Sequence, residues 1–528
     1  MEEEEHCFYF SKKMKIILFS LLIALNLVLR TPFFSHEYGS DSFVIHILGN
    51  SISEFGCAQW WINKLAIVGL YPYSECSAVP FVLSGISQTT GIDMEHVILL
   101  FCIFLGLLNV FAAYIMAGEI IDDDLFKFLV AFGLSTSPAI LNYLTWTITM
   151  RAPFIALLPL FVYILLKCRT YKLRYGFLTL ILSTLLFLTH HLAYFLIPVF
   201  IGYFIVVISY KLKSHVKSIK IPEKYITFAL IIAFLVMFAI PFQTGRLIID
   251  VGSRYVAVNN LFLSNLPRYI GVLGIFAIGG VIYLLFRPNK SFGEWSLLFI
   301  MLFLTPFLYV QTYMKWFIPC FIFPFVGIGL INALKTDERK KKYAILVVII
   351  LLLLSVSFSG FYQHWRTKGG SVYLFEGYMK ETTYTTGLWV KENIDNGSLI
   401  SNDIMLGLRV FAVSEVPLFT GADTIDQVYG FGDVNELELE KKSITEEDYW
   451  LNGPYRIRSG ESEIYRQEIL RNYEYYERSK YNFTHVIEDK RLHGLFTYHG
   501  VQPSKFLYHI YDKKDCIYDN GNINIWIL

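Results

Sequence analysis

Long apolar stretches recur through the first 360 residues of this 528-residue chain and limit what it can fold into. Most have roughly 16 to 22 residues, about the length that an α-helix needs to cross a ~30 Å hydrocarbon layer. They lie at residues 14–29, 97–117, 125–141, 152–166, 173–188, 191–210, 225–242, 269–286, 295–310, 315–334 and 343–360. The sequence therefore predicts a polytopic α-helical membrane protein with about 11 transmembrane helices.

The remaining residues have a different composition. The chain is 55% hydrophobic and 17% charged, whereas about 25% charged residues is usual for a soluble domain. Of the 44 carboxylates, 25 lie after residue 360. We therefore expect a transmembrane domain at residues 1–360 and a water-soluble α+β domain at 361–528. In the latter, helices are expected at 384–393 and 461–478, and Asn520-Gly521 predicts a hairpin turn.

The distribution of Lys and Arg predicts the orientation. These residues are abundant in alternate loops between the apolar stretches and scarce in the others, and the rich loops belong on the cytoplasmic side. An odd number of spans then gives a cytoplasmic amino terminus and an extracytoplasmic domain at 361–528, with the chain in the cell membrane. The first span is not a removable signal peptide, since no small-residue cleavage site follows Arg30.

Charge and motifs exclude several functions. The chain has 45 Lys and Arg against 44 Asp and Glu, so it lacks the basic excess that nucleic-acid binding requires. Neither a zinc-type Cys and His spacing nor a P-loop or G-x-G-x-x-G motif is present. We therefore expect no cofactor. Cys57 and Cys76 share one loop, where one disulfide can form if that side is oxidising.

The first external loop, residues 30–96, is too long to be a simple connection. Its segment Ser42–Phe55 has helical apolar spacing and predicts a helix along the membrane surface that begins near Asp41. Two hypotheses for Asp41 stay open. It is the N-cap of this helix, or it is the general base that activates an acceptor hydroxyl near the lipid headgroups.

Several motifs resemble one family. Gly39-Ser-Asp41-Ser-Phe43, His46, Asn50–Gly56 and Tyr71-Pro72 are similar to the first external loop of archaeal members of the GT-C superfamily of lipid-phosphosugar-dependent glycosyltransferases. Thr145–Arg151 resembles their second external loop, and Thr386–Asn393, Ile400–Asp403 and Gly407–Arg409 resemble their external domain. The superfamily includes protein O-mannosyltransferases and oligosaccharyltransferase catalytic subunits. The resemblance implies that Asp41 is the catalytic residue and that the donor is a polyprenyl (dolichyl) phosphate sugar.

One departure from the family bears on metal dependence. Oligosaccharyltransferases carry acidic metal ligands in the second external loop, where this chain has Arg151. The resemblance therefore favours a monophosphate-linked donor without a metal, although a divalent metal stays open. Asp122, Asp123 and Asp124 fall on the predicted cytoplasmic side and are interpreted as solvated loop charges.

The remaining candidate residues concern substrate binding. A departing lipid phosphate gains negative charge, and Arg is suited to hold it. Arg151, Arg246 and Arg254 lie on external loops, and Arg254 is the preferred candidate because it is central in its loop; snorkelling to lipid headgroups is the alternative. Tyr71 fits a sugar subsite or an interfacial aromatic belt. His46 is a further substrate-binding candidate. It would lie about 140° from Asp41 around a helix that contains both, whereas contact between them becomes possible if Asp41 lies just before the first turn.

The leading hypothesis is thus an inverting hexosyltransferase that acts at the outer membrane face. The acceptor, whether a protein, a glycan or a lipid, is not defined by the sequence. The adjacent His190 and His191 are minor catalytic candidates at an external turn. Two other classes stay open. One is a lipid or sugar transporter, against which the lack of paired repeats counts, and the other is a noncatalytic scaffold derived from a transferase.

Overall fold

A computed structural model describes residues 8–58, 78–215, 223–243, 268–308, 313–335, 338–367, 378–401, 403–418, 436–441, 477–482, 484–490 and 515–527. The chain divides into two compact units. The first contains residues 1–31, 100–145 and 150–366, and the second contains 32–99, 146–149 and 367–528. The first external loop and a short piece of the second thus belong with the carboxy-terminal residues.

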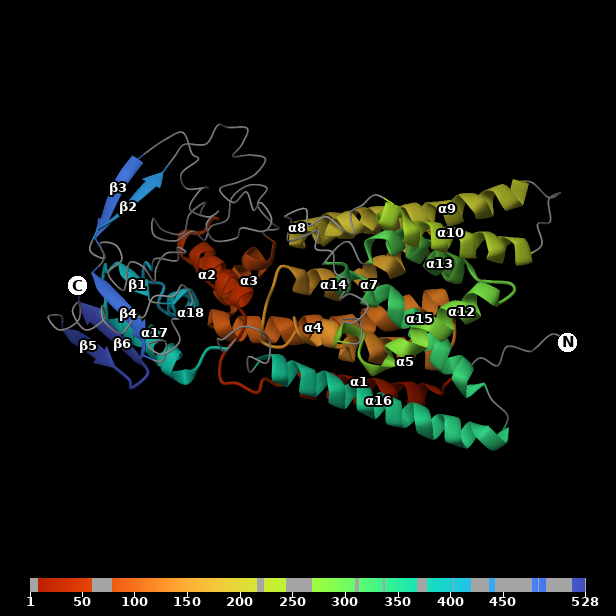
Figure 1. Cartoon of the computed structure of the whole chain (residues 1–528), viewed down its shortest axis with the longest axis horizontal. Helices are drawn as coiled ribbons and strands as arrows, with labels where there is room; N and C mark the ends of the chain where they lie inside the picture. The colour runs from red at the N-terminus through yellow and green to blue at the C-terminus, as the bar shows by residue number, and fades with distance from the viewer. Residues whose placement is uncertain are drawn as a thin grey trace. The chain divides into compact units, whose positions relative to one another are not determined.

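The first unit is helical (Figure 1). Where the structure describes the predicted apolar stretches, they fold mainly into helices, some of them broken into two. Their bounds are α1 Lys12–Arg30, α4 Met94–Ile120, α5 Asp124–Thr136, α6 Pro138–Leu141, α7 Arg151–Lys167, α8 Lys172–Thr189, α9 Leu196–His215, α10 Glu223–Gln243, α12 Ile275–Phe286, α13 Phe292–Leu304, α14 Met314–Phe317, α15 Pro319–Leu334 and α16 Glu338–Thr367. Helix α4 begins in the second unit and continues into the first.

Membrane insertion follows from the apolar helices. Within the described residues, four segments are long and apolar enough to cross a membrane: Met94–Ile120, Lys172–Thr189, His191–Leu212 and Lys340–Trp365. Shorter apolar helices accompany them. These helices indicate a membrane protein. That eleven helices cross the membrane, and in which direction, stays a prediction.

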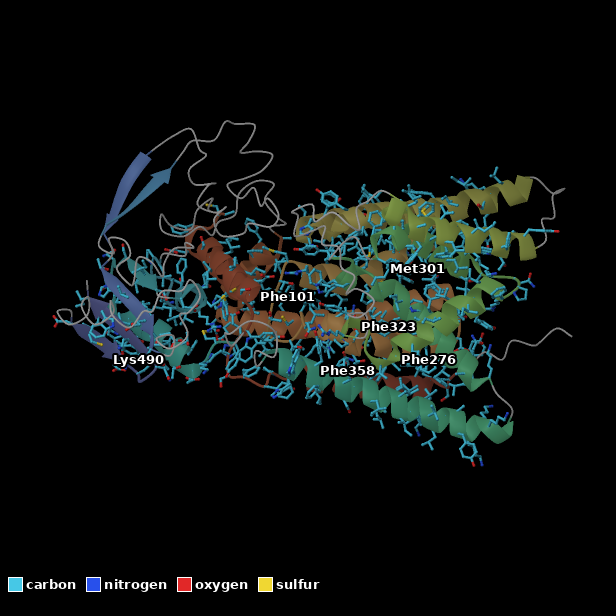
Figure 2. All side chains as sticks on the ribbon, viewed as in Figure 1. Phe101, Phe276, Met301, Phe323, Phe358 and Lys490 are labelled. Carbon is cyan, nitrogen blue, oxygen red and sulfur yellow. The ribbon has the colours of Figure 1, made fainter. Side chains whose placement is uncertain are left out.

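Small residues allow the helices of the first unit to pack closely. Helix α12 lies against α15, where a Cβ at Gly280 or at Gly329 would overlap the backbone of the opposite helix. Figure 2 shows the side chains that fill the spaces between the helices, among them Phe323 of α15. Its ring occupies the place that a larger side chain at Gly133 of α5 would need.

Arg30 ends α1 and is fully buried. Its guanidinium donates to Asn26 Oδ1 at 2.6 Å and to the backbone carbonyl of Ser135 in α5 at 3.2 Å. The side chain passes over Gly106 of α4, where any Cβ would collide with it. One cationic side chain therefore joins three helices of the first unit.

The interpretation of the acidic run at 122–124 is wrong for two of its members. Asp123 is 3% exposed and Asp124 is fully buried. Asp123 caps α5 by accepting from the Phe126 amide, and it also accepts from the Phe8 amide at 2.7 Å. Asp124 pairs with Lys15 at 2.9 Å. These carboxylates anchor the amino-terminal segment, whereas Asp122 alone is exposed.

The second unit combines helices with two sheets (Figure 1). Helices α2 and α3 pack together, as do α17 and α18, and α18 also contacts α2. One sheet has the order β1-β4-β6-β5, with β1 parallel to β4 and the other pairs antiparallel, and β2 pairs with β3. The bounds are α2 Ser40–Phe55, α3 Ala78–Thr90, α17 Glu381–Asn393, α18 Ile404–Ser414, β1 Leu399–Ser401, β2 Glu436–Lys441, β3 Glu477–Asn482, β4 His485–Asp489, β5 Cys516–Asp519 and β6 Ile523–Ile527.

The predicted hairpin at Asn520-Gly521 is confirmed, because β5 and β6 are antiparallel and Gly521 has a φ of +86°. Lys490, labelled in Figure 2, bonds Asp519 at 2.6 Å beside this turn. The helix expected at 384–393 corresponds to α17. The one expected at 461–478 lies largely outside the described residues, and its last two residues begin β3 instead.

Candidate active site

Asp41 lies in the first turn of α2 and is exposed. The N-cap of this helix is Gly39, whose φ of +94° suits glycine and which has no side chain to make a cap hydrogen bond. The hypothesis that Asp41 is the N-cap is therefore wrong, because the helix begins one residue before it. Its carboxylate is nevertheless placed at the positive end of the helix dipole. Its role as a base stays a prediction.

A buried carboxylate lies directly before this turn. Glu37 has no exposed surface, and its Oε2 accepts from the Ser42 hydroxyl at 3.0 Å. Its Oε1 binds His46 Nδ1 at 2.6 Å. Burial by itself lowers the pKa of His46, but the charge of Glu37 and the hydrogen bond to it outweigh burial and raise the pKa above its ordinary value.

His46 therefore points into the protein toward Glu37, while Asp41 is on the exposed side of the same helix. This agrees with the expected separation of about 140° around a helix that includes both residues. Contact between His46 and a substrate stays a prediction. What the structure assigns to the side chain is a hydrogen bond that holds Glu37.

A second ionic group lies beside the first. Glu95, at the start of α4, accepts from the Glu37 amide at 2.9 Å and from His36 Nδ1 at 3.1 Å. His36 Nε2 contacts Glu381 of α17 at 2.9 Å, and its ring stacks on Tyr384. Since a neutral imidazole carries a single N–H, only the doubly protonated ring donates to both carboxylates.

The pKa of His36 is shifted in the direction that favours the doubly protonated ring. Burial of the ring lowers it, but the hydrogen bond and charge of Glu95, together with those of Glu381, raise it above the ordinary value. The first external loop is thus joined to α4 and α17 by charge-assisted hydrogen bonds.

Residues 146–149, from the second predicted external loop, pack in the same unit. Trp146 has a φ of +44° and donates from Nε1 to the Glu95 carbonyl at 3.1 Å. Its own carbonyl accepts from the Tyr38 amide, and the Ile148 amide donates to Ser42 Oγ at 3.1 Å. A bulky residue at positive φ is strained, and such strain gathers at functional sites. The structure therefore brings parts of both predicted external loops together.

Arg151 begins α7 in the first unit. Its guanidinium lies 4.6 Å from the centre of the Trp316 ring, 5.2 Å from that of Tyr143 and 5.7 Å from that of Tyr313. Cation–π contacts of this kind hold an arginine in place without neutralising its charge. His190 and His191 lie near this group, since the His191 ring is 4.8 Å from Tyr313.

Three predicted site residues, Tyr71, Arg246 and Arg254, lie outside the described residues, as does Cys76. Arg151 belongs to the first unit and Asp41 to the second. Glu37, Glu95 and Glu381 were not predicted as members of the site. A weak signal was available, because Glu37 follows a histidine and lies four residues from Asp41. Among the described residues, no three His, Cys, Asp or Glu side chains gather as a metal site.

Comparisons with known proteins support a shared fold. No protein-family model and no curated protein matches the sequence. The oligosaccharyltransferase of Archaeoglobus fulgidus, solved with a tethered acceptor peptide, matches with a TM-score of 0.58 and 11% identity over 92% of this chain and 70% of that chain. This enzyme, AglB, has also been solved with dolichol-phosphate.

Two bacterial enzymes are also similar in structure. ArnT from Cupriavidus metallidurans, bound to undecaprenyl phosphate, matches with a TM-score of 0.52 and 10% identity over 98% of both chains. The arabinofuranosyltransferase AftD from Mycobacteria gives a TM-score of 0.52 and 10% identity over 98% of this chain and 40% of its own. All three are GT-C glycosyltransferases, and this chain shares their fold.

Proposed function

We propose that this chain, which has the fold of the GT-C glycosyltransferases, is a membrane glycosyltransferase that takes a hexose from a polyprenyl monophosphate and inverts its anomeric configuration. The observation that carries the proposal is Asp41, an exposed carboxylate on a helix turn whose neighbours are held by buried hydrogen bonds. The polyprenyl phosphates bound to ArnT and AglB support a lipid-phosphate carrier.

In the proposed reaction, the Asp41 carboxylate accepts the proton of the acceptor hydroxyl. The hydroxyl oxygen forms a bond to the anomeric carbon from the face opposite the phosphate. The bond between that carbon and the phosphate oxygen breaks, and the polyprenyl phosphate leaves with the electron pair. A single displacement of this kind inverts the anomeric centre.

The leaving phosphate needs a cation that neutralises its developing charge. Arg151 is suited to this role because aromatic rings hold its planar guanidinium in place, and a guanidinium binds phosphate through two parallel hydrogen bonds. We propose Arg254 and Arg246 as further phosphate contacts, Tyr71 as part of the sugar subsite and His46 as a residue near it. With cations in these positions, the transfer needs no divalent metal.

The test is a donor screen with purified protein in detergent, using polyprenyl monophosphate and pyrophosphate sugars. Asp41→Asn cannot accept a proton at neutral pH and should lower transfer about a hundredfold or more. The matched control is Asp395→Asn, an exposed aspartate after α17, which should leave transfer unchanged. A chelator should have little effect.

Three outcomes would change the proposal. Full activity of the Asp41→Asn variant would eliminate the base mechanism. Loss of activity on chelation would keep the transferase but indicate a metal-dependent, pyrophosphate-linked donor. Movement of the lipid-linked sugar across a vesicle membrane without any transfer, in wild type and variant alike, would instead support a transporter.

A further inference from the structure

We propose that Glu37 is a positioning residue: its buried carboxylate, bonded to Ser42 and His46, fixes the first turn of α2 and thereby the place of Asp41. The inference rests on the proposed function, because it assigns a role in catalysis to a side chain that does not reach solvent. It extends that function by naming what holds the base in position.

Glu37 has no exposed surface, and a buried carboxylate is costly unless its oxygens are hydrogen-bonded. Both oxygens are, to Ser42 Oγ at 3.0 Å and to His46 Nδ1 at 2.6 Å. Because replacing a whole buried ionic group by apolar residues is often neutral or stabilising, stability alone does not account for Glu37 together with its two partners.

The partners of Glu37 lie on both sides of Asp41. Ser42 directly follows Asp41 in the first turn of α2, and His46 lies on the next turn. One carboxylate therefore holds two points of the helix end that carries the proposed base. Rotation of this turn would break both bonds at once, so the direction in which Asp41 projects is fixed by Glu37.

Ser42 extends the connection to the second external loop. Its hydroxyl donates to Glu37 and accepts from the Ile148 amide, so the three groups form a continuous chain. The hydroxyl hydrogen is committed to Glu37 only while that residue is an acceptor. Glu37 thus orients the hydroxyl that joins the turn of Asp41 to residues 146–149.

The backbone of Glu37 is held as well. Its amide donates to Glu95 Oε1 at 2.9 Å, and its carbonyl accepts from the Met379 amide at 3.1 Å. Because its backbone is bonded to Glu95 and Met379, the Glu37 side chain extends from a position that does not move with α2. Displacement of a catalytic group by about 1 Å can cost roughly a hundredfold in rate. We therefore expect kcat to depend on how firmly Glu37 holds the turn that carries Asp41.

The test compares Glu37→Gln and Ser42→Ala with a control, Glu54→Gln. The control makes the same Glu-to-Gln change at an exposed position of α2. The Glu37→Gln change turns one acceptor oxygen into an NH2 group, which cannot accept from Ser42 or His46. Two measurements are made on full-length protein in detergent. The first gives kcat and KM for the donor per folded molecule, and the second gives hydrogen–deuterium exchange over peptides that cover 40–46 and 146–149.

Glu37→Gln and Ser42→Ala should each lower kcat about tenfold or more with the donor KM within about twofold, since the base is displaced but the donor site is not. The double variant should be about as slow as the slower single variant, because both changes break one connection. Exchange should rise in both peptides. Glu54→Gln should match wild type in every measurement.

The inference is overturned if Glu37→Gln keeps wild-type kcat and wild-type exchange, or if kcat per folded molecule is unchanged while only the folded yield falls. An inactive Asp41→Asn with a fully active Glu37→Gln would reject the positioning role and keep the proposed function. If wild type transfers no sugar, the proposed function fails by itself, and unchanged exchange in Glu37→Gln would then reject the inference separately.

Discussion

Replacing Gly39 with alanine tests the geometry of the proposed site most directly. Gly39 is the N-cap of α2 with φ +94° and ψ 133°, a conformation that L-residues avoid at a cost of about 1–3 kcal/mol. A Cβ there would also lie 2.8 Å from Thr147 Oγ1, and Thr147 is 4% exposed. Moving that buried side chain costs about 1 kcal/mol more. Gly39→Ala should therefore destabilise the protein by about 2–4 kcal/mol.

Gly56→Ala is the matched control, because Gly56 is the C-cap of the same helix. Its φ is +70° and its ψ 4°, and nothing lies within 4 Å of an added Cβ. The left-handed conformation alone should cost about 1–2 kcal/mol. The double variant Gly39→Ala/Thr147→Ala should recover the steric part of the Gly39 penalty but not the backbone part.

The assay is unfolding with sodium dodecyl sulfate in mixed micelles, followed by tryptophan fluorescence, together with sugar transfer for each variant. Gly39→Ala should lower kcat more than Gly56→Ala does, because Asp41 lies two residues from Gly39. If Gly39→Ala were as stable as wild type, or if the Thr147 change made no difference, the assignment of strain to this turn would be refuted.

Three other predictions concern separate parts of the chain. The pKa of His36 is raised in the folded protein, so its contribution to stability should be complete below pH 6.5, the ordinary histidine pKa. That contribution should be lost as the pH rises through the higher folded pKa. His36→Gln should therefore flatten the melting temperature as a function of pH over this range. Arg151→Lys keeps the charge but loses the planar stacking and the paired donors, and should lower kcat by roughly tenfold in the transfer assay. An impermeant reagent on intact cells should label a cysteine placed at Ser371 and not one at Lys340, and the opposite pattern would reverse the predicted topology.

The helices were predictable because their signals are local. An apolar stretch that must satisfy its own backbone hydrogen bonds in lipid becomes a helix whatever surrounds it. The hairpin at Asn520-Gly521 was predictable for a similar reason, since glycine supplies the positive φ that the turn requires. The same local pattern placed the start of α2 within two residues of its observed position at Ser40.

Where the predicted environment of an acidic residue was wrong or missing, its hydrogen-bond partners were distant in sequence. Asp123 and Asp124 look like solvated charges until the amides of Phe8 and Phe10, more than a hundred residues away, are found bonded to them. Glu37 had no sequence signal of burial for the same reason, because its backbone partners Glu95 and Met379 are remote. The cap of α2 is a separate, local case: Asp41 was one alternative because aspartate is a common cap, whereas the nearby Gly39 occupies that position.

The buried Arg30 has a consequence for how relatives of this chain can diverge. Its guanidinium lies where any side chain at position 106 would be, so the two positions cannot change independently. A lineage that gains a larger residue at 106 must first lose the arginine, and loss of the arginine removes the donor for Asn26 Oδ1 and for the Ser135 carbonyl. Substitutions at positions 30 and 106 should therefore appear together among homologues. Homologues that lack Arg30 should have apolar residues at position 26 more often.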